Sequence, residues 1–157
     1  MILTVGAVAP EFSLIDQHGA ETRLSALIER MPVALVFFPL AFSSTCEGEL
    51  CELRDNLADF DQAGVQLVGI SVDSKHALRA WADREGYSFS LLADFWPHGE
   101  VAHAYGAFRE DRGFADRATF LIGTDGVIVD SFVTAPGIAR PLSRYRAALA
   151  QLGPAAH

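Results

Sequence analysis

The stretch VALVFFPLAFSSTC, residues 33–46, decides how this chain folds and where its chemistry lies. The apolar run 33–38 predicts a buried strand, and Pro39 begins a short loop that leads to Cys46. A polar-apolar pattern follows, which predicts a helix over about 45–60. A thiol in the first turn of a helix meets unpaired backbone N–H groups and the positive end of the helix dipole, which favour the thiolate. We therefore expect Cys46 to be a nucleophile.

The predicted helix carries one apolar face, which we expect to turn toward the sheet and to cover Cys46 in part. At 100° per residue, Cys51 lies about 140° away from Cys46, on the more polar side. Two interpretations of Cys51 stay open: an inert thiol that packs well, or a redox partner of Cys46. The apolar face comprises Cys46, Leu50, Leu53, Leu57 and Phe60.

Size and charge narrow the class of protein. The chain has 157 residues, half of them apolar, which predicts a single domain over 1–152 and a loose tail at 153–157. A net charge of −8 with Lys75 as the only lysine argues against nucleic-acid binding. We recognise neither a signal segment nor an apolar stretch of about 18 residues, so we expect a cytoplasmic protein away from membranes.

The cysteines and histidines limit the choice of site. Two cysteines five positions apart do not form a secreted disulfide framework, and such a pair is more often catalytic or metal-binding. The five histidines are scattered without the spacing of zinc ligands, so we expect no metal and no cofactor.

The order of elements predicts an α/β fold with a mixed central sheet flanked by helices, an architecture that resembles thioredoxin. Strands and helices alternate at first, and Thr124-Asp125-Gly126 then joins two strands as an antiparallel hairpin. Residues 12–19 suggest a further small hairpin. Strands are predicted near 33–38, 65–72, 119–123 and 127–133, and helices near 45–60, 74–85, 99–105 and 141–152.

The spacing Pro39-x-x-x-Ser43-x-x-Cys46 resembles the signature of peroxiredoxins, in which Cys46 would be the peroxidatic residue. Glu49, Trp81 and Arg117 support the resemblance. The strings FFPLAF at 37–42, DFWPHG at 94–99 and AYG at 104–106 are similar to the actinobacterial alkyl hydroperoxide reductase E group. The resemblance implies a thioredoxin-like fold and a peroxidase recycled by an external thiol of the mycothiol and mycoredoxin kind.

Peroxide reduction makes chemical sense of these residues, because hydrogen-bond donors must converge on both peroxide oxygens. Ser43 can offer a hydroxyl, and Arg117 a guanidinium group. Pro39 stiffens the loop and has no N–H to compete. Glu49 would disfavour a neighbouring thiolate if it acted alone, so we expect it to pair with Arg117 or another arginine. The alternatives are a strand end for Pro39, a helix cap for Ser43, a surface ion pair for Arg117 and a solvated Glu49.

The chain departs from the common pattern of the group at two positions. Ser43 stands where the family more often has Thr, and Cys51 is absent from one-cysteine members. The spacing Cys46-x-x-x-x-Cys51 resembles atypical two-cysteine peroxiredoxins of the bacterioferritin comigratory type, which implies an internal disulfide and a thioredoxin-type reductant. No cysteine follows Cys51 to serve as another resolving thiol.

Two other functions stay open from the sequence. A thioredoxin-like disulfide oxidoreductase normally carries C-x-x-C, which this chain lacks. A binding or holdase module is the other, although no phosphate-binding glycine motif is present. Two interpretations are open for the aromatic residues Phe42, Phe95 and Trp96. They belong either to the core or to a homodimer interface near the Cys46 loop, and the resemblance implies such an interface.

Overall fold

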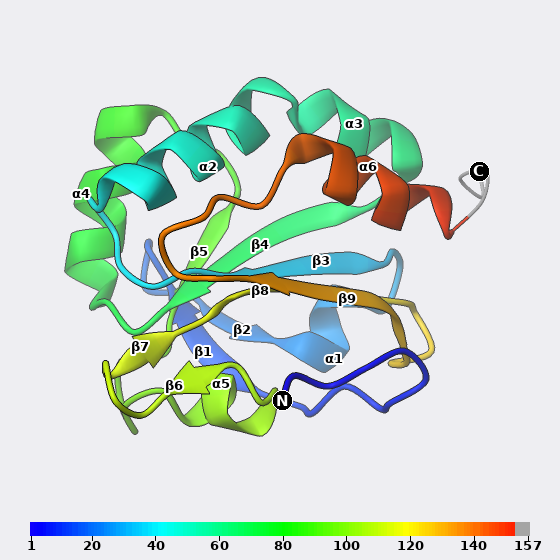
Figure 1. The fold of residues 1–157 in the computed structure, drawn as a ribbon, viewed down its shortest axis with the longest axis horizontal. Coiled ribbons are helices and arrows are strands. Elements are labelled where there is room, and N and C mark those ends of the chain that lie inside the picture. Colours follow the sequence, from blue (N-terminus) through cyan, green and yellow to red (C-terminus); the bar gives the residue numbers. More distant parts are fainter. Residues whose placement is uncertain (153–157) are drawn as a thin grey trace.

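The structure, a computed structural model, describes residues 1–152 and is built around a seven-stranded sheet in the order β2-β1-β5-β4-β3-β8-β9 (Figure 1). The short strands β6 and β7 pair separately. The strands are β1 Ser13–Asp16, β2 Glu21–Arg23, β3 Val33–Phe37, β4 Gln66–Ser71, β5 Ser90–Ala93, β6 Phe108–Arg109, β7 Phe114–Ala115, β8 Arg117–Ile122 and β9 Ile128–Thr134. The helices are α1 Leu24–Leu27, α2 Ser44–Asp55, α3 Leu57–Ala63, α4 Lys75–Glu85, α5 Glu100–Ala104 and α6 Leu142–Ala150.

The sheet is mixed, as the sequence predicts. Strand β3 pairs in parallel with β4 and antiparallel with β8. Strand β9 pairs antiparallel with β8 after the predicted turn, where Gly126 takes a φ of 80° that most other residues avoid. The thioredoxin-like α/β architecture is confirmed.

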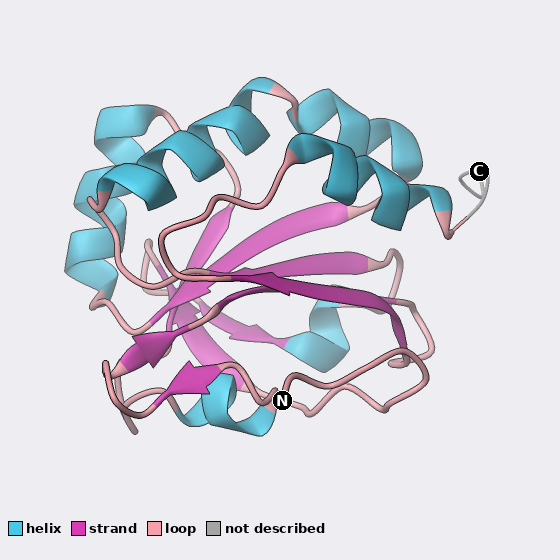
Figure 2. Ribbon diagram, in the orientation of Figure 1, coloured by secondary structure: helices cyan, strands magenta, loops and turns pink. Residues whose placement is uncertain are grey.

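Both faces of the sheet are covered by helices (Figure 2). Helices α2, α3, α4 and α6 lie on one face, and α1 and α5 lie on the other (Figure 1). Successive side chains of β3 alternate between these layers, because a strand points neighbouring residues to opposite faces. Ala34 and Val36 enter the core beneath α2, whereas Leu35 and Phe37 enter the opposite core.

The predicted helix 45–60 is wrong as a single element. It is divided into α2 and α3 at Asn56, whose φ of −118° and ψ of 23° are not helical. The Asn56 side chain donates to the carbonyl of Glu52, and such local bonds compete with helix continuation. The predicted apolar face nevertheless persists across the break, since Cys46 and Phe60 are both buried in one core.

Other boundaries differ from the predictions in smaller ways. Strand β8 begins at Arg117, two residues earlier than predicted, so Arg117 lies within the sheet. The N-terminal hairpin exists but extends to Arg23, and β5 was not predicted at all. Helix α6 ends at Ala150, and the predicted tail 153–157 lies outside the described residues.

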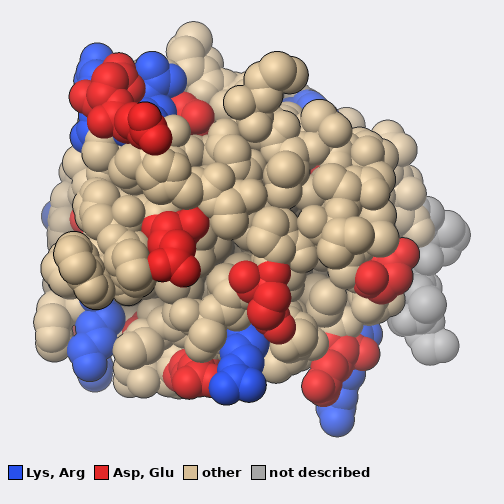
Figure 3. Space-filling model, turned by 90° about the horizontal axis from the view of Figure 1, so that it is seen from below, with Lys and Arg blue, Asp and Glu red and all other residues tan. Residues whose placement is uncertain are grey.

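The exposed fractions of three aromatic side chains show whether they belong to the core. Phe42, Phe95 and Trp96 are 43%, 53% and 81% exposed, so their assignment to the core is wrong. On the face seen from below, basic side chains are few and acidic ones lie among them (Figure 3). No helix within residues 1–152 has both the length and the apolar character that a membrane crossing requires.

Candidate active site at the start of α2

Cys46 lies in the first turn of α2 and is fully buried, with an exposed fraction of 0%. Ser43 occupies the N-cap position, but its hydroxyl does not cap the helix and donates to the Leu40 carbonyl at 3.1 Å instead. The first N–H groups of a helix have no partner within the helix. The backbone amides around Cys46 therefore lack a side-chain cap and point toward the space before the helix.

The loop before Cys46 is held from two sides. Phe42 adopts a φ of 68°, an unfavourable value for a side chain of this size. Its ring packs against Trp81 at 6.1 Å and lies under the Arg84 guanidinium at 4.8 Å. On the other side, the Ala41 N–H donates to the Asp73 carboxylate at 2.8 Å. These contacts fix the path of the loop that begins at the buried Pro39.

A buried carboxylate and two arginines lie one turn after Cys46. Glu49 accepts from Arg140 three times, from its backbone N–H at 2.6 Å, from Nε at 2.9 Å and from Nη2 at 2.5 Å. Arg117 Nη1 donates to the same carboxylate at 3.2 Å, while its Nε donates to the Pro136 carbonyl at 2.5 Å. Arg140 Nη1 is bound to the Thr119 hydroxyl at 3.1 Å. The expected pairing of Glu49 with Arg117 is confirmed, and a second arginine is added.

Charge neutralisation is visible in the pKa values of this cluster. Burial alone would raise the pKa of Glu49, but hydrogen bonds and charge from Arg140, with the charge of Arg117, hold it below its ordinary value. Burial alone would lower the pKa of Arg140, yet Tyr145, Glu49 and Cys46 raise it. Burial also raises the pKa of Tyr145 to about 12. Arg140 therefore stays positive beside the thiol-bearing helix.

Sequence reasoning missed Arg140, which lies in the loop between β9 and α6, 91 positions from Glu49. One signal was available. Glu49 interrupts the apolar face between Cys46 and Leu50, and a carboxylate on a buried face needs charged and hydrogen-bonding partners. The alternation of β8 accounts for Arg117 and Thr119, which lie two residues apart and so point to the same face.

Cys51 lies on the same helix but in different surroundings. It is half-buried and packs against the core beneath α2. Its Sγ lies 3.3 Å from the Tyr87 hydroxyl and 3.6 Å from Glu85 Oε2. The predicted polar side of the helix is therefore partly covered by the end of α4, which sequence spacing did not indicate. Both cysteines are free thiols.

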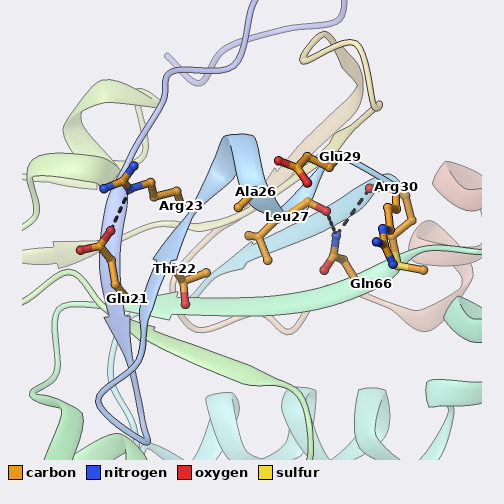
Figure 4. A pocket seen from close by; sticks show the side chains of 9 residues that line it. Glu21, Thr22, Arg23, Ala26, Leu27, Glu29, Arg30 and Gln66 are labelled. Atoms are coloured by element: carbon orange, nitrogen blue, oxygen red, sulfur yellow. Dashed lines mark hydrogen bonds and ion pairs between the residues drawn. The ribbon is translucent and has the colours of Figure 1, made fainter.

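Within residues 1–152, no group of three or more His, Cys, Asp and Glu side chains is placed to hold a metal ion. An open hollow of about 500 Å³ lies beside β2 and α1, where Glu21 pairs with Arg23 and Gln66 bonds the Leu27 carbonyl (Figure 4). Neither cysteine lines it, so its size does not make it the active site.

Comparison with known proteins gives a consistent result. Residues 5–131 match the model of the AhpC/TSA family. Alkyl hydroperoxide reductase E of Mycobacterium tuberculosis strain H37Rv is 42% identical over 151 residues, which cover 96% of this chain and 99% of the relative. Peroxiredoxin Bcp of Escherichia coli K12 is 34% identical over 83% of this chain and 85% of its own length. The crystal structure of peroxidoxin BcpB from Mycobacterium tuberculosis superposes with a TM-score of 0.84 at 31% identity, covering 96% of each chain.

Proposed function

The chain belongs to the AhpC/TSA family and is a thiol-dependent peroxidase of the peroxiredoxin kind, and we propose that Cys46 attacks the hydroperoxide and Cys51 resolves the product. The observation that carries the assignment of Cys46 is its place in the uncapped first turn of α2, one turn before a carboxylate that binds two arginines. Hydrogen peroxide and small organic hydroperoxides are the proposed substrates.

In the first step, the Cys46 thiolate attacks one peroxide oxygen. An S–O bond forms, the O–O bond breaks, and the other oxygen leaves as hydroxide or alkoxide and takes up a proton. Cys46 becomes a sulfenic acid. The site must therefore stabilise an anionic sulfur first and a developing oxyanion afterwards.

The two arginines suit different parts of this task. Each guanidinium nitrogen of Arg140 donates to Glu49 or Thr119, so this side chain is held at all three nitrogens. Arg117 Nη2 makes no hydrogen bond within residues 1–152, while Nε and Nη1 are held. We assign Arg117 as the donor to the peroxide, together with the Cys46 backbone N–H, and Glu49 as the group that orients it. Ser43 and Pro39 shape the loop on which the peroxide rests.

In the second step, the Cys51 sulfur attacks the sulfenic sulfur of Cys46, an S–S bond forms and water leaves. An intact helix opposes this step, because residues five apart have Cα atoms about 8 to 9 Å apart, beyond the roughly 7 Å that a disulfide spans. The first turn of α2 must therefore unwind. The absence of a side-chain cap at Ser43 makes this turn the natural place to open.

The disulfide would be reduced by an external thiol. A thioredoxin-type donor suits an internal disulfide, whereas a mycothiol and mycoredoxin system fits the mycobacterial relative, and both place the protein in a reducing cytoplasm. We also propose a homodimer that covers the exposed Phe42, Phe95 and Trp96 near the Cys46 loop. Sedimentation velocity that gives the monomer mass at every concentration would refute the dimer.

The test of the resolving role is mass spectrometry after one equivalent of hydrogen peroxide. We expect a mass loss of about two hydrogens, with a disulfide that joins the Cys46 and Cys51 peptides. Persistent sulfenic acid on Cys46 beside a free Cys51 would establish a one-cysteine peroxidase that depends on an external thiol. Oxidation of Cys51 alone would reverse the assignment of the nucleophile.

A further inference from the structure

Two oxygen groups from the end of α4 converge on the sulfur of Cys51. Glu85 is the last residue of α4, and Tyr87 follows the turn at Gly86, whose φ is 72°. Glu85 Oε2 lies 3.6 Å from Sγ, and the Tyr87 hydroxyl lies 3.3 Å from it. A half-buried thiol that only fills space needs neither contact, and the first step of the reaction uses neither group.

The Glu85 carboxylate is held with one oxygen directed at the thiol. Its Oε1 accepts from Arg84 Nε at 3.0 Å, and Arg54 Nη1 lies 3.8 Å from Oε2. Arg54 Nη1 also donates to the Glu85 carbonyl at 2.5 Å, which fixes the backbone at this point. The Glu85 side chain is 22% exposed, so a proton that it receives can pass on to water.

Tyr87 fits the role of a donor rather than an acceptor. Burial raises the pKa of Tyr87 far above its ordinary value, and the hydrogen bond and charge of Cys51 add to the effect. The phenol therefore keeps its proton at any working pH. Its O–H can donate to the Cys51 sulfur, which leaves the S–H of Cys51 to point at Glu85.

We propose that Glu85 is the general base of the resolving step and that Tyr87 positions the attacking sulfur. Glu85 Oε2 accepts the Cys51 thiol proton as the sulfur attacks the Cys46 sulfenic acid, the S–S bond forms and the S–O bond breaks. Hydroxide leaves and is protonated, so one water is released in total. This inference rests on the proposed resolving role of Cys51.

The same contacts explain how Cys51 can stay in place while the helix start opens. Arg84 bonds both Glu47, in the first turn of α2, and Glu85, at Cys51. Unwinding of the first turn releases Glu47 but leaves the contacts between Cys51 and the end of α4 intact. Cys46 then moves toward a sulfur whose position and proton acceptor are already fixed.

A carboxylate beside a thiol can also act in the opposite sense, by repelling the thiolate. The groups that face Cys51 are Glu85 at the end of α4, Tyr87 after it, and Arg54 with its partner Asp55 on α2. Removal of the Glu85 charge distinguishes the two roles. If Glu85 is a general base, the resolving reaction becomes slower. If Glu85 only repels the thiolate, the resolving reaction becomes faster.

The experiment follows disulfide formation in Glu85→Gln after a pulse of one equivalent of hydrogen peroxide. Samples from rapid mixing are quenched in acid, alkylated and analysed by mass spectrometry, so that sulfenic acid and disulfide are counted separately. We expect the wild-type resolving rate to change little between about pH 5.5 and 7.5. In Glu85→Gln we expect it to be at least about 10²-fold slower at pH 6, because a positioned base is absent. The rate should then rise about 10-fold for each pH unit, as a reaction of free thiolate does below the pKa of an ordinary thiol, about 8.5.

Glu52→Gln is the matched control, since Glu52 is an exposed carboxylate next to Cys51 in the chain, and we expect wild-type kinetics from it. Tyr87→Phe should slow resolution while it keeps the flat pH profile. An equal or faster rate in Glu85→Gln with an unchanged pH profile overturns the role of Glu85 alone. A wild-type protein that makes sulfenic acid on Cys46 but no disulfide overturns the role of Glu85 and the resolving role of Cys51, and leaves the peroxidase assignment standing.

Discussion

The two halves of α2 hold their cysteines in different ways. Around Cys46, the buried Glu49 accepts four hydrogen bonds from two arginines of distant segments, and the side chains are almost wholly excluded from water. Around Cys51, two side chains from the end of α4 contact a half-buried sulfur. In the proposed mechanism, the first arrangement is preorganised for attack on a small molecule. In the same mechanism, the second arrangement receives the sulfur of Cys46 after the helix start has unwound.

The comparison predicts its largest effect at the two sulfurs. Cys46→Ser should abolish peroxide reduction, because a hydroxyl at this position is not an effective nucleophile. Cys51→Ser should still form sulfenic acid on Cys46 and fail only at resolution. Peroxide consumption with a thiol reductant measures both variants. Turnover in Cys46→Ser together with its loss in Cys51→Ser would exchange the roles of the two halves.

Glu49→Gln should give the next largest effect, on stability. Two buried arginines would lose their counter-charge, and breaking a buried ion pair in this way costs about 3 to 5 kcal/mol of unfolding free energy. Urea unfolding at pH 7 measures the loss, and Glu52→Gln serves as the exposed control on the same helix.

The effect of Glu49 should also depend on pH. The pKa of Glu49 is lowered in the folded protein from its ordinary value of 4.5, so its stabilisation is fully present above pH 4.5 and is lost as pH falls through the folded value. The difference between wild type and Glu49→Gln should therefore shrink in acid below pH 4.5. A difference that stays constant down to the acid unfolding range would show that the ionised carboxylate is not what holds the arginines.

Arg117→Ala should lower the second-order rate with hydrogen peroxide by about 10²-fold, because loss of one donor to a developing oxyanion typically costs about 3 kcal/mol. Arg146→Ala is the matched control, since Arg146 pairs with Asp59 on the surface at 2.9 Å. Stopped-flow oxidation of the reduced protein measures both rates. A near-normal rate in Arg117→Ala would leave Arg117 as a partner of Glu49 only.

The same contrast explains what could be read from the sequence. The strand at 33–37, the helix start at Cys46 and the hairpin between β8 and β9 follow from local patterns of apolar residues and turns. Arg140 could not be placed, because a loop residue 91 positions from Glu49 carries no periodicity. The contacts of Glu85 and Tyr87 with Cys51 could not be predicted for a related reason. They depend on how α4 packs against α2, and the spacing of residues within either helix does not indicate that packing.

The smallest effect is expected from the ion pair between Glu47, in the first turn of α2, and Arg84 of α4. Glu47 pairs with Arg84, and the Glu47 side chain is 30% exposed, so this pair should stabilise the first turn only slightly. Glu47→Gln should therefore raise hydrogen exchange of the hydrogen-bonded backbone amides of residues 47–50 by about 1.4-fold to 5-fold in the reduced protein, which corresponds to the 0.2 to 1 kcal/mol typical of exposed pairs.

Glu52→Gln should leave the exchange of these amides unchanged, because the exposed Glu52 lies in the second half of the helix. Exchange of residues 51–55 should stay near wild type in both variants, since the end of α4 still holds Cys51 and Arg54. Equal acceleration along the whole of α2 in Glu47→Gln would mean that the helix opens as one unit. The sulfur of Cys51 would then be no fixed target, and the division of α2 into a part that unwinds and a part that stays would fail.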